Sequence, residues 1–373
     1  MIKISSDFDS GNIAVVDAND PNDIKLEIKS DGKADFYQWF YYQVDGASGR
    51  PLTMRLMNAH GASYVDGWKD YRAVASYDGE EWFRIDAAFD GKELMIKHQP
   101  EQDRIFYAYF APYTTERYRS YIASIQSSPV LSHEILGQTL DGQDISYLRA
   151  GNGPRQMWVI ARQHPGETMG SWWIEGFMDK LTADGDEDAA TLMEKATLHI
   201  VPCMNLDGAK RGHLRTNAAG IDLNRAWQNT TMEKSPEVYL VRERMREIGV
   251  DFFLDVHGDE AIPNNFLDSA NGIPSWDDVH AQRFERFSNL LLETSADFQT
   301  KDGYPPSAPG KANLDIANSY VAETWGCLSM TLEMPFKDAN VNPDRKYGWS
   351  PARCRNFAQE HLTVMAKIVD GLR

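Results

Sequence analysis

The stretch MWVIARQHPGE at 157–167 decides the fold of the larger part of this chain. It opens with a short apolar run, typical of a strand buried on both faces of a sheet, and the helical pattern SWWIEGFMDKL follows at 171–181. Helical patterns separate this run from three further apolar strand candidates, at 198–204, 252–257 and 327–334. Strands that alternate with helices predict an α/β fold with a doubly wound, mixed and mostly parallel sheet.

Further helices are expected at 236–249 and 280–295, and a long final helix should open with Ser350 as its cap and Pro351 at its first position. The stretch from Thr300 to Ala312 is rich in Gly, Pro and Lys. We expect it to be a long loop that borders a pocket.

The first 110 or so residues show a different pattern. Short apolar or aromatic runs alternate there with turn signals, at 36–44, 51–59, 80–89 and 104–111. This spacing predicts an all-β sandwich. Because 373 residues are too many for one typical domain, we expect two: the sandwich at 1–112 and the α/β domain at 113–373.

Composition narrows the class of protein. A formal charge of −17 argues against nucleic acid or an anionic membrane as partner, since both demand a basic surface. The start MIKISSDFDSGN does not resemble a signal peptide, and no apolar run reaches the length of a membrane span. The three cysteines, at unrelated spacings, fit a reducing compartment. We expect a soluble, cytoplasmic protein, and the sequence leaves its oligomeric state open.

Two histidines follow predicted strands at equivalent ends. His164 comes after the strand at 157–162, and His257 ends the strand at 252–257. Open α/β sheets bind their ligands at the carboxyl ends of parallel strands, so these side chains should lie close together. The spacing HxxE alone is weak, because it also occurs at His98 and Glu101 in the predicted sandwich, where a surface loop explains it.

A catalytic zinc ion needs three nitrogen or carboxylate ligands and one open position, and His164, Glu167 and His257 can supply that set. Glu260 is a rival carboxylate ligand. Glu167 is preferred because the tight turn at Pro165 can fold its side chain back beside His164. Ligand type narrows the metal to a divalent ion without fixing it as zinc.

The segment NLDGAKRGHLRTNAAGIDLNR at 205–225 supplies groups that bind carboxylates. Arg225 with Asn224 could hold the terminal carboxylate of a substrate, and Arg215 could polarise a carbonyl group. The alternative is a solvated basic turn in which Asp222 and Arg225 pair locally. Glu333 stands late in an otherwise apolar strand, where a carboxylate needs a role, and general base is the expected one.

The motifs HPGE, NLDG, LRTNAAGIDLNR and DVHG, with the late strand ending in TLE, resemble the zinc metallocarboxypeptidase family. They resemble its cytosolic branch best, which has an N-terminal β-sandwich, an aromatic segment like 39–42 and a junction like 112–114. The resemblance implies one zinc ion per chain and a role for each matched residue. The implied roles are zinc ligand for His164, Glu167 and His257, carbonyl polarisation for Arg215, carboxylate binding for Asn224 and Arg225, general base for Glu333, and orientation of His164 for Asp222.

The implied reaction is hydrolysis of the C-terminal peptide bond of a peptide or protein. Members of the cytosolic branch often remove glutamate, so an acidic preference is a further expectation, with Lys311, Lys210 or Arg211 as its source. Met330 stands where that branch often has tyrosine, and the mobile tyrosine of secreted relatives has Tyr304 and Tyr320 as its nearest candidates.

Two rival functions were weighed against this one. A zinc amidohydrolase that deacylates N-acyl amino acids, as aspartoacylase-like proteins do, shares similar motifs but lacks an N-terminal sandwich of this length. A non-catalytic module that grips the C-termini of proteins would be expected to lose a ligand or Glu333, and this chain keeps them all.

Overall fold

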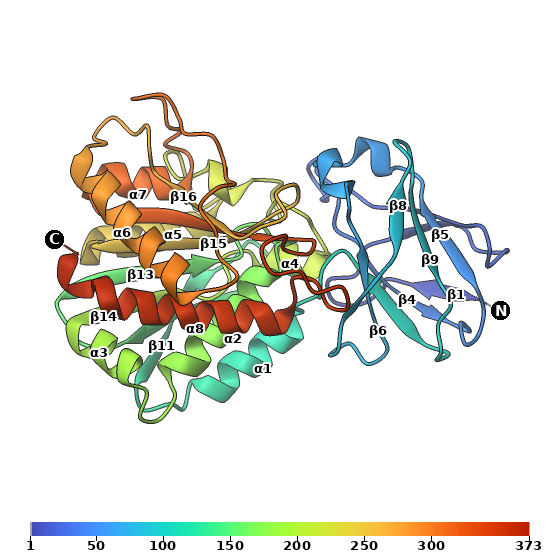
Figure 1. Cartoon of the computed structure of the whole chain (residues 1–373), viewed down its shortest axis with the longest axis horizontal. Helices are drawn as coiled ribbons and strands as arrows, with labels where there is room; N and C mark the ends of the chain where they lie inside the picture. Colours follow the sequence, from blue (N-terminus) through green and yellow to red (C-terminus); the bar gives the residue numbers. More distant parts are fainter. Residues whose placement is uncertain (1, 373) are drawn as a thin grey trace.

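The computed structural model describes residues 2–372 and consists of two bodies that lie side by side (Figure 1). The body that carries the N-terminus is made mainly of strands, and in the body that carries the C-terminus helices pack against a sheet. This is the predicted fold class, an all-β sandwich before a mixed α/β domain.

The N-terminal body is a sandwich of two five-stranded sheets. Side chains alternate along its strands: Leu52, Met54 and Leu56 are buried, while Thr53 and Arg55 are half-buried. The first sheet has the order β1 (Lys3–Ser5), β4 (Tyr41–Asp45), β10 (Ile105–Ala108), β6 (Ala73–Ser76) and β7 (Phe83–Ile85). The second has the order β2 (Ala14–Asp17), β3 (Ile24–Glu27), β5 (Leu52–Leu56), β9 (Leu94–His98) and β8 (Ala87–Phe89).

Two of the predicted strand runs differ in detail. In the run 36–44 the strand begins only at Tyr41, because Gln38 bonds through its side chain to both backbone groups of Tyr64 instead of joining a ladder. The run 80–89 is divided between the two sheets, with β7 in one and β8 in the other.

The C-terminal body is built on a seven-stranded sheet with four adjacent parallel strands, β14, β13, β15 and β17. The remaining strands are antiparallel to their neighbours. The full order is β11 (Leu131–Gln138), β12 (Asp144–Ala150), β14 (Ala196–Val201), β13 (Arg155–Ala161), β15 (Phe252–Asp259), β17 (Leu328–Pro335) and β16 (Phe266–Ser269).

Helices cover both faces of this sheet, which explains the continuous apolar runs of its central strands. Met157 and Val159 of β13 belong to a buried cluster with residues of α2 and α8, and the alternate residues Trp158 and Ile160 pack with α5 and α7. The helices are α1 (Thr115–Ile125), α2 (Met169–Leu181), α3 (Glu187–Lys195), α4 (Leu206–Arg211), α5 (Pro236–Ile248), α6 (Asp278–Thr294), α7 (Ala317–Trp325) and α8 (Pro351–Ile368). None of the helices described over residues 2–372 combines the length and apolarity that crossing a membrane requires.

The carboxyl ends of the parallel strands point toward the sandwich (Figure 1). The register pairs Ala161 of β13 with Val256 of β15, and His257 of β15 with Glu333 of β17. Just beyond β17, Phe336 stacks on Tyr109 of the sandwich with ring centroids 4.5 Å apart. The two bodies therefore meet beside the strand ends that carry the predicted site.

Candidate active site

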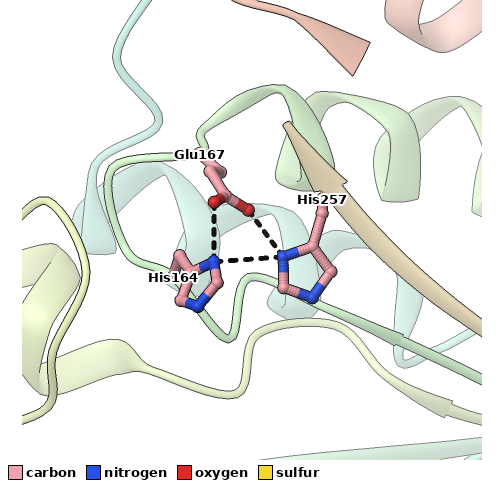
Figure 2. Close-up of side chains that lie close together, drawn as sticks. All are labelled: His164, Glu167 and His257. Atoms are coloured by element: carbon pink, nitrogen blue, oxygen red, sulfur yellow. Dashed lines mark hydrogen bonds and ion pairs between the residues drawn. The ribbon is translucent and has the colours of Figure 1, made fainter. Parts of the chain in front are cut away.

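The three predicted metal ligands converge at the ends of β13 and β15 (Figure 2). His164 Nδ1 lies 2.6 Å from Glu167 Oε1, and His257 Nδ1 lies 2.7 Å from Glu167 Oε2. The two Nδ1 atoms are 3.2 Å apart. One donor atom from each residue fits within 4.8 Å of the others, and all three residues are buried. Two imidazole nitrogens and a carboxylate oxygen at this spacing are the donor set that a catalytic zinc ion uses.

The local sequence explains how Glu167 returns beside His164. After β13, Arg162 takes a left-handed conformation with φ of 64°, and its Nε donates to Pro165 O at 2.7 Å. Gly166 then passes so close to the next loop that a Cβ there would lie 2.8 Å from Leu214 O. The segment between β13 and α2 is thus a tight turn, and position 166 within it has room only for glycine.

Buried polar groups contact His257 on the side of the ring opposite Glu167. Its Nε2 lies 2.8 Å from Asp255 Oδ2 and 3.4 Å from the amide nitrogen of Asn224. Gln163 donates to the same Asp255 oxygen at 2.6 Å. A carboxylate on the outer nitrogen fixes the ring and leaves Nδ1 free for a metal. The sequence alone assigned no role to Asp255. Residues two apart on a strand share a face, so the spacing of Asp255 and His257 could have indicated that this carboxylate lies beside the histidine.

Asp222 connects several groups of the site. Its Oδ1 lies 3.0 Å from His164 Nε2 and accepts the backbone N–H of Asn224 at 2.9 Å, and its Oδ2 accepts from Arg215 Nε at 2.7 Å. Burial acts to raise the pKa of Asp222, but His164 and Arg215 outweigh it and hold that pKa well below the usual range. Asp222 pairs with Arg215, and no ion pair of the local Asp222–Arg225 alternative is found among the described residues.

The sandwich supplies the other support of Arg215, and sequence reasoning missed it entirely. The buried Asp31 accepts the backbone N–H groups of Leu214, Arg215 and Thr216 at 2.6, 2.7 and 2.8 Å. The Arg215 guanidinium donates to the Tyr64 hydroxyl, and it lies 5.6 Å from the centroid of the Phe36 ring. A loop of one body is therefore positioned by residues of the other.

Asn224 and Arg225 lie side by side in a short 3₁₀ turn, Leu223–Arg225. Arg225 Nη1 donates to Asn224 O at 2.7 Å. The Asn224 side chain accepts from the backbone N–H of Ala317, at the start of α7, at 2.9 Å. Both residues line the same cavity as His164 and Glu167.

Glu333 lies on β17 directly across from His257 and is buried. Its Oε1 lies 3.4 Å from the Tyr304 hydroxyl, which donates to Asp259 Oδ2 at 2.7 Å. Burial raises the pKa of the Glu333 carboxyl well above its usual range, and nearby carboxylates add to the rise while His257 opposes it. Met330 belongs to the buried cluster on the α2 and α8 side of the sheet, so its thioether lies away from this carboxyl.

These groups surround one cavity of about 260 Å³. Five carboxylates and two arginines line it: Glu167, Asp259, Glu260, Asp268 and Glu333, with Arg215 and Arg225. Tyr304 of the long loop lines it as well. Tyr320, the other tyrosine considered, does not line the cavity, and its hydroxyl instead accepts from Arg246 at 3.0 Å.

The three cations considered for an acidic pocket lie outside this cavity. Lys210, Arg211 and Lys311 are exposed, and Arg211 pairs with Asp141 at 2.7 Å. His98, set aside as structural, is in the sandwich with Nδ1 3.0 Å from the Tyr107 hydroxyl.

Comparison with known proteins matches both bodies to families. Residues 4–110 match the cytosolic carboxypeptidase N-terminal domain, and residues 118–353 match the zinc carboxypeptidase family. A protein of Zymomonas mobilis is 45% identical over 371 residues, which cover 100% of this chain and 97% of that protein.

Two solved structures are similar over both full chains. A metallo-carboxypeptidase from Pseudomonas aeruginosa, in complex with (2-guanidinoethylmercapto)succinic acid, is 43% identical with a TM-score of 0.98 and 100% coverage of each chain. A metallo-carboxypeptidase from Burkholderia cenocepacia is 41% identical, again with a TM-score of 0.98 and 100% coverage of each chain.

Proposed function

Because the chain belongs to the zinc carboxypeptidase family and carries the N-terminal domain of its cytosolic members, we propose that it is a zinc-dependent carboxypeptidase that hydrolyses the C-terminal peptide bond of peptides or proteins. One observation supports this most strongly. The His164, Glu167 and His257 donor set, a buried carboxylate and two arginines meet at a single cavity.

The residues fit one zinc ion per chain. Glu167 offers an oxygen to each histidine Nδ1, and the outer nitrogens of both rings face carboxylates, Asp222 and Asp255. Those partners favour the tautomer that leaves Nδ1 as a ligand. His164 and Glu167 also line the cavity, so the centre faces the space that a substrate would enter. Zinc at this place supplies Lewis acidity: it lowers the pKa of water and polarises a carbonyl group.

Glu333 is proposed as the group that moves the proton. In this mechanism its carboxylate takes a proton from the attacking water and returns it to the nitrogen of the leaving amino acid. Its burial and raised pKa suit that exchange, because a carboxyl whose pKa is raised above its usual range holds a transferred proton more readily.

Arg215 is proposed to donate to the carbonyl oxygen as negative charge develops there. Its guanidinium is fixed by Asp222 and Tyr64 while it still lines the cavity. Such fixed donors are most effective because they need no reorganisation during the reaction.

Asn224 and Arg225 are proposed to hold the terminal carboxylate of the substrate, since an arginine fork pairs with both carboxylate oxygens. This pairing would place the last peptide bond, and no internal one, beside Glu333. It distinguishes an exopeptidase from an endopeptidase.

The rival functions have less support. The match of residues 4–110 to the cytosolic carboxypeptidase N-terminal domain favours a peptidase over an N-acyl amino acid hydrolase. The convergence of Glu333 with the three donor residues favours catalysis over simple capture of C-termini.

Among residues 2–372, the only lysines or arginines that line the cavity are Arg215 and Arg225, which already have proposed roles. A preference for an acidic C-terminal residue therefore has no further cation in the cavity to bind that side chain. The ligand of the Pseudomonas relative, by its name, joins carboxylic acid groups to a guanidine group. We propose that the present cavity accepts molecules with the same pairing, a carboxylate at one end and a cation at the other.

The test is release of the C-terminal residue from a panel of peptides that end in Glu, Asp, Lys, Leu or Phe. Zinc-loaded protein, chelator-treated protein and zinc-loaded Glu333→Gln are compared. We expect loss of one residue by the first sample alone. Stoichiometric zinc with no trimming of any peptide would refute the proposal and leave N-acyl amino acids or C-terminus capture to be tested.

A further inference from the structure

The cavity contains one carboxylate that the proposed reaction does not use, that of Asp268. This residue is on β16, where its partner in the antiparallel register is Thr331 of β17. Residues directly opposite in such a pair point to the same face, and Thr331 and Glu333 are two apart on one strand. Asp268 therefore faces the cavity beside the proposed base, and it lines the cavity together with both of these residues.

The position of Asp268 along the cavity follows from its contacts with α7. Its backbone carbonyl accepts from the Asn318 side chain at 3.4 Å, while Asn224 accepts from the neighbouring Ala317 N–H at 2.9 Å. Asp268 and the proposed carboxylate anchor Asn224 are thus both fastened to the first turn of one helix. A peptide whose terminal carboxylate is held at Asn224, as proposed, would therefore place its last residue in the part of the cavity that Asp268 lines.

This carboxylate has no positive partner. Across residues 2–372 no lysine, arginine or histidine forms an ion pair with Asp268, which is half-buried. The two arginines of the cavity have other partners, Asp222 for Arg215 and the Asn224 carbonyl for Arg225. Burial raises the pKa of Asp268 to about 6, against a lowering hydrogen bond from Asn318. A half-buried carboxylate without a cation is costly, and a ligand that brings the cation removes that cost.

Resting on the proposed function, we propose that Asp268 makes the protein select substrates whose C-terminal residue is arginine or lysine. The side-chain cation would pair with the Asp268 carboxylate, and the fork of arginine can do so through two hydrogen bonds. Asp259, another acidic residue that lines the cavity, adds the same sign to its field. A glutamate side chain at this end would instead meet a carboxylate.

The test compares peptides that end in arginine with the same peptides ending in citrulline, which keeps the shape of arginine and removes its charge. The kcat/KM ratio of the two is measured for zinc-loaded wild type, Asp268→Asn and Asp268→Ser. Glu323→Gln on α7 is the matched control, since it removes a negative charge outside the cavity.

We expect wild type and Glu323→Gln to favour arginine by about tenfold or more, as charge-assisted hydrogen bonds allow. In both Asp268 variants the ratio should fall close to one, with the zinc content unchanged. A ratio near one in wild type, or a ratio that survives in both Asp268 variants, would overturn the selection by Asp268.

A binding measurement separates this inference from the hydrolysis on which it rests. Calorimetry compares N-acetylarginine with N-acetylcitrulline on the same zinc-loaded proteins. If no peptide is trimmed but wild type binds N-acetylarginine more tightly and Asp268→Asn does not, the selection by Asp268 stands and the hydrolysis fails. If peptides are trimmed while neither rate nor binding depends on the charge, the hydrolysis stands and the selection fails.

Discussion

The cavity has two walls that differ in how the chain builds them. The α/β wall places His257 and Glu333 on adjacent parallel strands, in direct register, where the sheet fixes them. The sandwich wall contributes Tyr64 and, through Asp31, the support of a loop that carries Arg215. The α/β body alone thus positions the ligands and the base, whereas the arginine depends on contact between the two bodies.

Removal of a ligand from the α/β wall should have the largest effect. His257→Ala deletes one of three donors, so we expect loss of both bound zinc and peptide trimming, with the sandwich intact. Metal analysis after dialysis, together with the trimming assay, measures this. Full zinc occupancy in the variant would show that the donor set is wrong.

Loss of the proposed base should be nearly as severe but should spare the metal. Glu333→Gln keeps the shape and removes the basic group, so kcat should fall by about 10²- to 10⁴-fold. Zinc content should equal that of wild type. A variant that retains most of its kcat would transfer the role to another carboxylate of the cavity, with Glu260 the first to examine.

Variants of the sandwich wall should affect Arg215 without touching the zinc ligands. Asp31→Ala leaves three buried N–H groups without an acceptor and should cost about 1–3 kcal/mol of unfolding free energy. We also expect kcat/KM to fall by roughly tenfold, since a displaced donor no longer meets the carbonyl oxygen. Denaturant unfolding and steady-state kinetics give the two values.

The zinc content of Asp31→Ala is the control, and it should not change. Unaltered kcat/KM in a clearly destabilised Asp31→Ala would mean that the sandwich braces the loop without serving the reaction.

Tyr64→Phe should be milder. It removes one acceptor from the Arg215 guanidinium and leaves Asp222 and the Phe36 ring in place. The lost bond is charge-assisted, but Asp222 still holds the guanidinium, so we expect a cost of about 1 kcal/mol, or roughly fivefold in kcat, with KM little changed. A rise in KM alone would instead place Tyr64 in substrate binding.

The smallest expected effect is the dependence of stability on pH that ionisation of Asp268 causes. Its pKa is raised to about 6, so in the folded protein its carboxyl holds a proton up to that pH, while the unfolded chain releases it near pH 4. Between these values the folded state binds more protons, and stability contributed by this group falls as the pH rises. Glu333, Tyr304 and Arg225 line the same cavity and titrate or bear charge there.

Comparison of Asp268→Asn with wild type isolates that contribution. The variant should gain in melting temperature relative to wild type above pH 6.5 and not at pH 4. The preference for arginine over citrulline should grow as the pH rises through about 6. A melting temperature difference that does not vary with pH would contradict the raised pKa.

Much of this molecule could be predicted from its sequence because the information is local. The run 157–167 contains a buried strand, a turn with a required glycine and two candidate ligands, and the structure places each near its expected neighbour. The sandwich followed from the spacing of its apolar runs. Asp255 could have been added from the spacing within D-V-H.

The rest depends on contacts that no local pattern reveals. Asp31 and Tyr64 reach Arg215 across 184 and 151 residues of sequence, from irregular segments of a different body. Asp268 enters the cavity only because an antiparallel edge strand joins an otherwise parallel group. The position of Lys311, exposed and outside the lining of the cavity, could not be predicted for a similar reason, because an irregular loop gives no register from which to place a side chain.

The most direct test of C-terminal hydrolysis uses two forms of one peptide that ends in arginine, one with a free terminal carboxylate and one with a terminal amide. Each is incubated with zinc-loaded protein and followed by mass spectrometry. We predict that the free acid loses one residue and that the amide loses it at least about a hundredfold more slowly, because Asn224 and Arg225 bind the carboxylate. Equal cleavage of both peptides, or cleavage at internal bonds, would contradict a C-terminal peptidase.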